Sequence, residues 1–264
     1  MAKAQYIGVG GVARKVKQPY VGVSGVARKV KSGYVGVSGV ARQFFQGGLQ
    51  ASSLAVGDSV YLNVNGTKRE FLVIQQGRPS TLYDVSCDGT WLLMKNVYTT
   101  IVWDSSYGSS YPNSDLCNYL GNTFIGLLDQ NVQSAIKQVK IPYWNGSTYS
   151  GSNGASCKIF ALSGKEVGGS SSYMPNDGVT LSYFAGTSEY DSKRIAYNLS
   201  GNSSIWWLRS IHTDTESSVN AWSVYTSGQL VAPDAATNKY GVRPALILPS
   251  TALFNPDTLD FVSA

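Results

Sequence analysis

Hydrophobic and polar positions alternate along much of the chain, and this two-residue period is typical of β-strands. In the first 45 residues the pattern recurs three times with a period of 14 residues, starting at Tyr6, Tyr20 and Tyr34. In each unit a β-branched stretch precedes a two-residue turn and an alternating stretch follows it. The turns are Gly10-Gly11, Ser24-Gly25 and Ser38-Gly39. The pattern predicts three short β-hairpins.

A hairpin of this length cannot bury a core alone, so the repeats need one another or a partner. Residues 1–42 also carry eight basic side chains and no acidic one, whereas the rest of the chain carries 13 basic and 16 acidic groups. We expect residues 1–48 to form a docking or oligomerising unit, with a trimer as one option. Binding to nucleic acid is disfavoured, because no aromatic stacking pattern or recognition helix accompanies the charge.

A linker is expected at 46–48 and 52–53, so that within the larger unit, residues 49–264, the folded domain starts near Leu54. Strands are predicted at 55–63 and 68–75 around the turn Asn65-Gly66, and at 82–85 and 90–95 around residues 87–89. The segment 158–162 is a candidate for a buried strand.

Two helices are predicted between these strands. One opens at Asn113 or Ser114 and the other after Asp129. Their inward positions are Leu116, Tyr119 and Leu120 in the first, and Val132, Ala135, Ile136 and Val139 in the second. Gly-, Ser- and Tyr-rich loops are expected at 146–154 and 168–186. The elements together predict an α+β fold with an antiparallel sheet, two helices and long loops.

The composition fits an extracellular or virion protein, with 43% hydrophobic and only 14% charged residues. No apolar run approaches the ~18 residues of a membrane span, so membrane insertion is not expected. Residues 1–5 contain no apolar core of a secretory signal. We therefore expect synthesis in a bacterial cytoplasm and release by lysis. Cys87, Cys117 and Cys157 have neither C-x-x-C spacing nor a neighbouring histidine, which favours small buried side chains over metal ligands or a disulfide framework.

Three segments of the C-terminal half carry a family resemblance. Residues 205–210 read Ile-Trp-Trp-Leu-Arg-Ser, residues 221–228 read Ala-Trp-Ser-Val-Tyr-Thr-Ser-Gly, and residues 240–246 read Tyr-Gly-Val-Arg-Pro-Ala-Leu. The combination resembles phage and bacterial domains similar to the formylglycine-generating-enzyme branch of the C-type lectin fold. Upstream matches lie at 114–120, 141–142 and 158–167, so the resemblance covers about residues 54–250.

The resemblance implies a non-enzymatic phage protein that needs no cofactor. Variable proteins of diversity-generating retroelements use this fold to hold a hypervariable face between fixed framework residues, and 211–239 would be that segment here. The 14-residue basic repeats resemble those that precede such domains in phage structural proteins. A virion location follows, as in a tail fibre. The expected target is a bacterial surface protein or glycan, and residues 1–48 would bind other virion proteins.

The side chains give these segments a physical interpretation. Trp206 and Trp207 point to opposite faces of a strand, so one is expected in the core and the other against ligand or loops. Arg209 and Arg243 are suited to clamping loop carbonyls and carboxylates, and Gly241 completes the framework set. In 221–226, Trp222 and the alternate residues on its side of the strand are expected to point inward, and Tyr225 and the residues on its side outward. The predicted ligand-binding residues are Ile211, His212, Thr213, Asp214, Glu216, Asn220, Ser223, Tyr225, Gln229, Pro233 and Asp234.

Other functions have weaker support in the sequence. A formylglycine-type oxidase needs a cysteine where Pro244 stands. His212 and Asp214 lack an activated nucleophile for a hydrolase, and Asp214 with Glu216 is a carboxylate pair of a spacing that is common by chance. Calcium-dependent sugar binding and other metal sites lack a convergent set of oxygen ligands. A capsid decoration or baseplate subunit without its own ligand stays open as an alternative.

Overall fold

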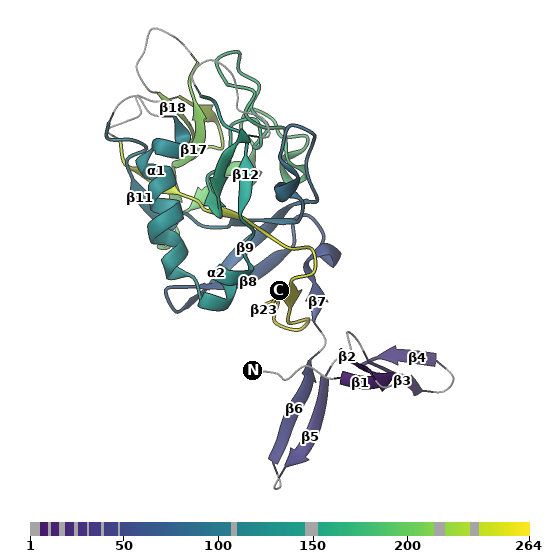
Figure 1. Cartoon of the computed structure of the whole chain (residues 1–264). Helices are drawn as coiled ribbons and strands as arrows, with labels where there is room; N and C mark the ends of the chain where they lie inside the picture. Colours follow the sequence, from purple (N-terminus) through teal and green to yellow (C-terminus); the bar gives the residue numbers. More distant parts are fainter. Residues whose placement is uncertain are drawn as a thin grey trace.

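The computed structural model describes residues 6–9, 12–15, 19–23, 26–30, 32–37, 40–46, 48–106, 110–145, 153–213, 220–232 and 238–264. Three hairpins precede a larger α+β unit (Figure 1). The α+β class predicted from the sequence is confirmed.

Each 14-residue repeat forms one antiparallel hairpin, as predicted. The three pairs are β1 (Tyr6–Val9) with β2 (Val12–Lys15), β3 (Tyr20–Val23) with β4 (Val26–Lys29), and β5 (Ser32–Val37) with β6 (Val40–Gln46). The same pairing of valines closes each hairpin next to its turn: Val9 with Val12, Val23 with Val26, and Val37 with Val40. The turn residues lie outside the described residues. Among the described strands each hairpin forms a sheet of its own.

The first large sheet is antiparallel, in the order β14-β21-β10-β9-β8. Its strands are β14 (Ile159–Phe160), β21 (Ala245–Leu248), β10 (Thr90–Met94), β9 (Thr67–Gln76) and β8 (Ser59–Val64). The predicted turn between β8 and β9 is confirmed, because Asn65 and Gly66 both have positive φ, as a tight hairpin requires. The strand predicted at 82–85 is wrong. The Asp84 side chain accepts from the Ser86 N–H and begins a short 3-10 helix, η2 (Val85–Cys87).

Both helices begin where the sequence predicts. Helix α1 (Asp115–Asn118) is capped by Ser114, whose Oγ accepts from the Cys117 N–H. The chain continues through a π-helical turn, η4 (Tyr119–Phe124), and a 3-10 turn, η5 (Ile125–Leu127). Helix α2 (Gln130–Ala135) follows Asp129. The second helix ends earlier than expected, so Val139 is buried in a strand, β12 (Val139–Ile141).

The second large sheet has the order β11-β20-β17-β18-β19. Its strands are β11 (Thr99–Ile101), β20 (Tyr240–Val242), β17 (Trp206–Ile211), β18 (Ala221–Val224) and β19 (Leu230–Val231). β17 and β20 are parallel and the other pairs are antiparallel. β17 and β18 lie at the end of the α+β unit that points away from the hairpins (Figure 1).

Gly241 is needed where β20 and β17 meet. A Cβ atom at this position would lie 2.5 Å from Val97 Cγ1 and 2.7 Å from the Ile205 carbonyl oxygen, so no larger residue fits.

Smaller sheets complete the unit. They are β12 with β13 (Ala155–Cys157), β15 (Ala196–Tyr197) with β16 (Ser203–Ser204), and the triplet of β23 (Phe261–Ser263), β22 (Leu253–Phe254) and β7 (Leu49–Gln50). Four more 3-10 turns are η1 (Ala51–Ser53), η3 (Tyr111–Asn113), η7 (Ser182–Phe184) and η8 (Ser192–Arg194). The predicted linker at 52–53 is therefore wrong: these serines belong to η1, which follows a strand paired with β22.

The core contains four fully buried tryptophans, Trp91, Trp103, Trp206 and Trp207. Each indole N–H donates to a backbone carbonyl at 2.9–3.0 Å, which compensates for its burial. Trp206 and Trp207 are both buried, so neither ring presents a surface to a ligand. In the described part of the chain, no helix is long and apolar enough to span a membrane.

Candidate ligand-binding site

A bulge in β17 sends two polar side chains into the interior. Trp207 pairs with Ser223 and Ile211 pairs with Ala221, so three residues of β17 face one residue of β18. At the bulge the Arg209 N–H donates to the Leu162 carbonyl, 2.8 Å away. Bulges re-aim side chains in this way. Arg209 and the adjacent Ser210 are both buried as a result.

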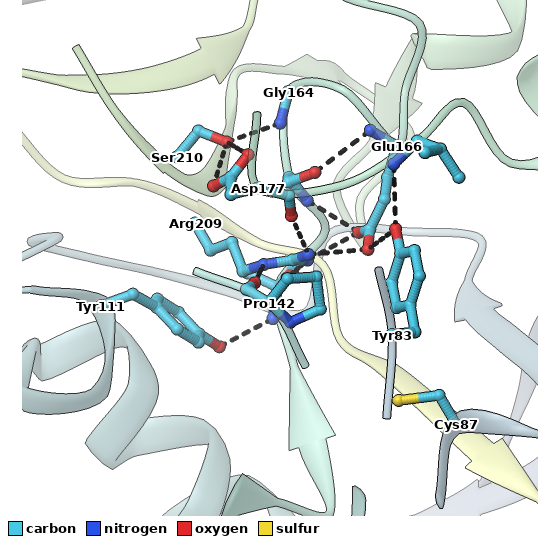
Figure 2. A network of polar contacts seen from close by, with 12 residues as sticks. Tyr83, Cys87, Tyr111, Pro142, Gly164, Glu166, Asp177, Arg209 and Ser210 are labelled. Atoms are coloured by element: carbon cyan, nitrogen blue, oxygen red, sulfur yellow. Dashed lines mark hydrogen bonds and ion pairs between the residues drawn. The ribbon is translucent and has the colours of Figure 1, made fainter. Parts of the chain in front are cut away.

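Arg209 binds three segments of backbone and one carboxylate (Figure 2). Its guanidinium donates to the carbonyls of Pro142 at 2.9 Å, Ala161 at 3.0 Å and Asp177 at 2.8 Å. It also forms a two-pronged ion pair with Glu166, at 2.6 and 2.7 Å, in which neither side chain is exposed. This is the clamp of carbonyls and a carboxylate that the sequence suggested for this arginine.

Glu166 has further partners in a local motif. The Ser163 N–H donates to Glu166 Oε2 at 2.8 Å, and the Glu166 N–H donates to Ser163 Oγ at 3.1 Å. This reciprocal pair is the Ser-x-x-Glu capping box, a signal visible in the sequence at 163–166 that our prediction missed. The Tyr83 hydroxyl donates to Glu166 Oε1 at 2.8 Å. Burial and the neighbouring Glu166 carboxylate raise the pKa of Tyr83, which keeps this donor protonated.

Ser210 links a second buried acid to the network. Its hydroxyl donates to the Asp177 carboxylate at 2.8–2.9 Å and accepts from the Gly164 N–H at 2.8 Å. Burial raises the pKa of Asp177 to about 6, although the charge of Arg209 and the hydrogen bond from Ser210 act in the opposite direction. Arg209 and Ser210 thus fix residues 164–166 and Asp177, the two ends of the loop 167–176.

A second buried arginine holds the neighbouring loops. Arg194 donates to the carbonyls of Val167 at 2.8 Å, Glu189 at 3.1 Å and Gly228 at 3.1 Å. It also donates to Thr187 Oγ1 at 2.9 Å. Three loops that are distant in sequence therefore converge on one guanidinium.

These loops enclose a surface cavity of about 450 Å³ next to β18. The wall consists of residues 168–171, Met174, 187–189, Arg194, Trp222 and Leu230. Both glycines of the wall lie close to other residues: a Cβ at Gly168 would lie 2.3 Å from Thr187 Oγ1, and one at Gly169 would lie 2.4 Å from Met174 Sδ. The volume is within the range of small-molecule sites, roughly 300–1,000 Å³.

Three aromatic rings stack beside the cavity. The ring centroids of Tyr173 and His212 are 4.9 Å apart with planes at 20°, and those of His212 and Trp222 are 5.6 Å apart at 25°. Tyr173 is 52% exposed, whereas Trp222 is only 7% exposed. The Thr213 N–H donates to the Tyr173 carbonyl at 2.9 Å, which joins the loop 167–176 to the end of β17.

The structure brings several predicted ligand-binding residues to this region. The His212 N–H donates to the Asn220 carbonyl at 2.6 Å and closes the base of the intervening loop. The Gln229 amide donates to Glu189 Oε1 at 3.1 Å, at the rim of the cavity. Ile211 is half-buried and Tyr225 is 46% exposed. Asp214, Glu216, Pro233 and Asp234 lie outside the described residues.

The prediction is wrong for one of the ligand-binding residues. Ser223 was assigned to the outer face of its strand, but its side chain is fully buried. The alternation argument assumes one solvent-exposed face, whereas all four residues of β18 are buried. The sequence also did not single out Tyr173, Glu189 or Arg194, because their proximity depends on distant parts of the chain.

The other predicted framework arginine, Arg243, has fewer partners. Its Nε donates to the Met94 carbonyl at 2.9 Å, and its guanidinium lies 4.9 Å from the centre of the Trp206 ring. Burial lowers the pKa of Arg243 to about 10. It holds the start of β21 against β10 and the Trp206 ring, away from the cavity wall.

The three cysteines are free thiols, and Cys87 and Cys157 are buried while Cys117 is half-buried. Burial raises the pKa of all three, that of Cys87 to about 11, so the reactive thiolate form is disfavoured. Within the described ranges, no cluster of three His, Cys, Asp or Glu residues could hold a metal ion.

The fold and site define an α+β domain in which two buried arginines support loops around a surface cavity. The chain belongs to the family described as a domain of unknown function, DUF6273, whose model matches residues 88–250. The match includes both arginines, both helices and the cavity. No curated protein and no solved structure matches the chain.

Proposed function

We propose that this protein is a non-enzymatic ligand-binding protein of a phage particle, with its binding face on a C-type-lectin-like scaffold. The observation that carries the proposal is the pair of buried arginine networks, which hold three loops around a surface cavity. Sites of this kind bind best when the loops are already ordered, because little entropy is then lost on binding.

The two buried acidic groups of the network, Glu166 and Asp177, have structural roles under this proposal. The Glu166 carboxylate accepts from Arg209, Tyr83 and the Ser163 N–H, and the side chain is not exposed. Asp177 is also fully buried and bound to Ser210. A general acid or base must reach the substrate to transfer a proton, and neither carboxyl group meets solvent.

The arrangement of the chain supports display on a particle. The hairpins project from one end of the α+β unit, while β17 and β18 lie at the other end (Figure 1). We propose that residues 1–48 bind other virion proteins and assemble several copies. The far end then contacts a bacterial surface protein or glycan, and several weak contacts together give avidity.

Adsorption to cells tests the proposal. Fluorescent beads coated with the full chain are incubated with a panel of Gram-positive and Gram-negative bacteria. We expect adsorption to at least one strain, and its loss in Tyr173→Ala combined with Tyr225→Ala, both exposed at the proposed face. Val85→Ala is the control, because this side chain is 70% exposed and lies in η2, outside the loops that form the cavity wall.

Two results would contradict the proposal. Beads that adsorb to no strain support a structural subunit without its own ligand. Adsorption that survives the double substitution but disappears when residues 1–48 are deleted would place binding in the repeats.

A further inference from the structure

The three N-terminal hairpins leave both of their edges unpaired among the described strands. Each hairpin forms a two-stranded sheet by itself, at the end of the chain that projects from the α+β unit (Figure 1). At the edges of such a sheet the outward N–H and C=O groups form a template for a further strand. An isolated two-stranded hairpin is only marginally stable in water, and a third strand stabilises it. The hairpins are therefore suited to bind a partner by strand addition.

The basic residues of the hairpins all lie at one edge. Within the described strands, arginine and lysine occur only in the second strand of each hairpin, β2, β4 or β6. The first strands, β1, β3 and β5, contain no charged residue. The residue directly opposite each arginine is apolar: Ile7 pairs with Arg14, Val21 with Arg28, and Val35 with Arg42. Because residues 1–42 include no carboxylate, the hairpins cannot neutralise this charge themselves.

The charge disfavours a second copy of the chain at the basic edge. Two such edges side by side would bring arginine and lysine of one copy opposite those of the other, and like charges directly opposite destabilise a sheet. Basic residues on edge strands commonly prevent self-association for this reason. The uncharged edge is a poorer template, because each of its strands contains a glycine without a side chain for a cross-strand pair: Gly8, Gly22 and Gly36.

A partner for the basic edge has to supply both negative charge and a peptide backbone. Nucleic acid supplies the charge, but its phosphates cannot continue a ladder of N–H and C=O groups. An extended protein segment with carboxylates at alternate positions supplies both. Its backbone completes the ladder, and its acidic side chains pair with arginine and lysine across the strands.

We propose that each hairpin binds an acidic β-strand of another protein at the edge formed by β2, β4 or β6. The inference rests on the proposed function, in which residues 1–48 bind other virion proteins, and it names the chemistry of that partner. The three repeats have the same register next to their turns, so they present three equivalent edges. A partner with repeated acidic strands binds them with avidity. The partner, rather than contact between hairpins, then brings several copies of the chain together.

A synthetic strand tests the proposal on the full chain. The probe is a fluorescent peptide in which glutamate and valine alternate over about eight residues, within the usual length of a strand. The comparison peptide has glutamine in place of glutamate. We expect the glutamate peptide to bind about tenfold more tightly in fluorescence anisotropy, and its affinity to fall as salt is added. With ¹³C-labelled carbonyl groups, the bound peptide should show the infrared amide band of a β-strand.

Charge reversal separates the basic edge from the net charge of the protein. We expect affinity for the glutamate peptide to fall about tenfold in the triple variant Arg14→Glu, Arg28→Glu and Arg42→Glu. The matched control makes the same change of net charge at three exposed lysines of the α+β unit, Lys140→Glu, Lys193→Glu and Lys239→Glu. The control should bind the peptide like the original chain.

Several results would overturn the inference. Equal affinity for the two peptides, equal losses in the two triple variants, or binding without the β-strand band would each exclude an acidic strand at this edge. Duplex DNA that binds more tightly than the glutamate peptide, and only through the three arginines, would assign the edge to nucleic acid. A chain that forms oligomers in light scattering and does not bind the peptide would assign the edges to a second copy.

Failure of this inference can be distinguished from failure of the proposed function. If the coated beads adsorb to bacteria through Tyr173 and Tyr225 but the glutamate peptide does not bind, the proposed function stands and only the chemistry of the partner is wrong. If the peptide binds and the beads adsorb to no strain, the hairpins have an acidic partner and the far end of the protein has no ligand of its own.

Discussion

Removal of the Arg209 side chain tests the structural role of the buried network. Arg209→Met deletes five hydrogen bonds and leaves the Glu166 carboxylate without its counter-ion. Breaking a buried ion pair by removing one partner costs about 3–5 kcal/mol. The carbonyls of Pro142, Ala161 and Asp177 also lose a donor, which places the expected loss at the upper end of this range. A domain has only about 5–15 kcal/mol of stability, so the variant should be close to unfolding.

A second substitution separates charge from packing. In Arg209→Met combined with Glu166→Met the unpaired charge is gone, so we expect about half of the lost stability to return. The recovery is partial because the three carbonyls still lack donors. Urea unfolding followed by near-ultraviolet circular dichroism measures both variants. Arg78→Met is the control, because this partly exposed arginine donates to the carbonyl of nearby Thr81 and forms no buried ion pair among the described residues. A loss below about 1 kcal/mol in Arg209→Met, or simple additivity in the double variant, would refute the reasoning.

Three further predictions concern the surroundings of the network. Asp177 has a pKa of about 6 in the folded protein against 3.8 for the free side chain, so the folded state binds the extra proton and stability falls as pH rises from about 4 to 6, by about 3 kcal/mol. Asp177→Asn should flatten this decrease of stability with pH when thermal unfolding is measured across the same pH range. An unchanged decrease would mean that another group causes it. Gly228→Ala should destabilise more than Gly201→Ala in the same melts. Both glycines have φ near +85°, but only at Gly228 would an added Cβ lie 2.3 Å from the Asp191 carbonyl oxygen. Equal losses of stability in the two variants would mean that the backbone moves apart at no cost. Native Cys87 and Cys157 should resist a thiol reagent at neutral pH and react after unfolding, because burial favours the neutral thiol; fast labelling of the native protein would contradict this.

Elements with local signals were predictable from the sequence. The three hairpins, the Asn65-Gly66 turn and the Ser114 cap depend on residues close in sequence, and each forms as expected. The prediction of a strand at 82–85 was wrong because of another local signal: the Asp84 side chain accepts a hydrogen bond from the Ser86 N–H, which favours a turn.

The site depends on contacts that local patterns cannot reveal. Arg209 meets Glu166 across 43 residues of sequence, and Arg194 meets Gly228 across 34. Burial of Ser223 was missed for a related reason, since it requires knowing that both faces of its sheet are covered. The fork geometry of arginine predicted what Arg209 would bind, whereas only the fold determines which carbonyls and which carboxylate it finds.

The two arginines recognise mostly main-chain carbonyl oxygens, which are the same whatever side chains the loops carry. Six of their hydrogen bonds end on such oxygens, from Pro142, Ala161, Val167, Asp177, Glu189 and Gly228. Substitutions at exposed loop positions such as Tyr173 therefore leave the anchors in place. Such a scaffold can exchange its surface chemistry at little risk to folding, which makes the domain evolvable and a practical starting point for engineering new binding specificities.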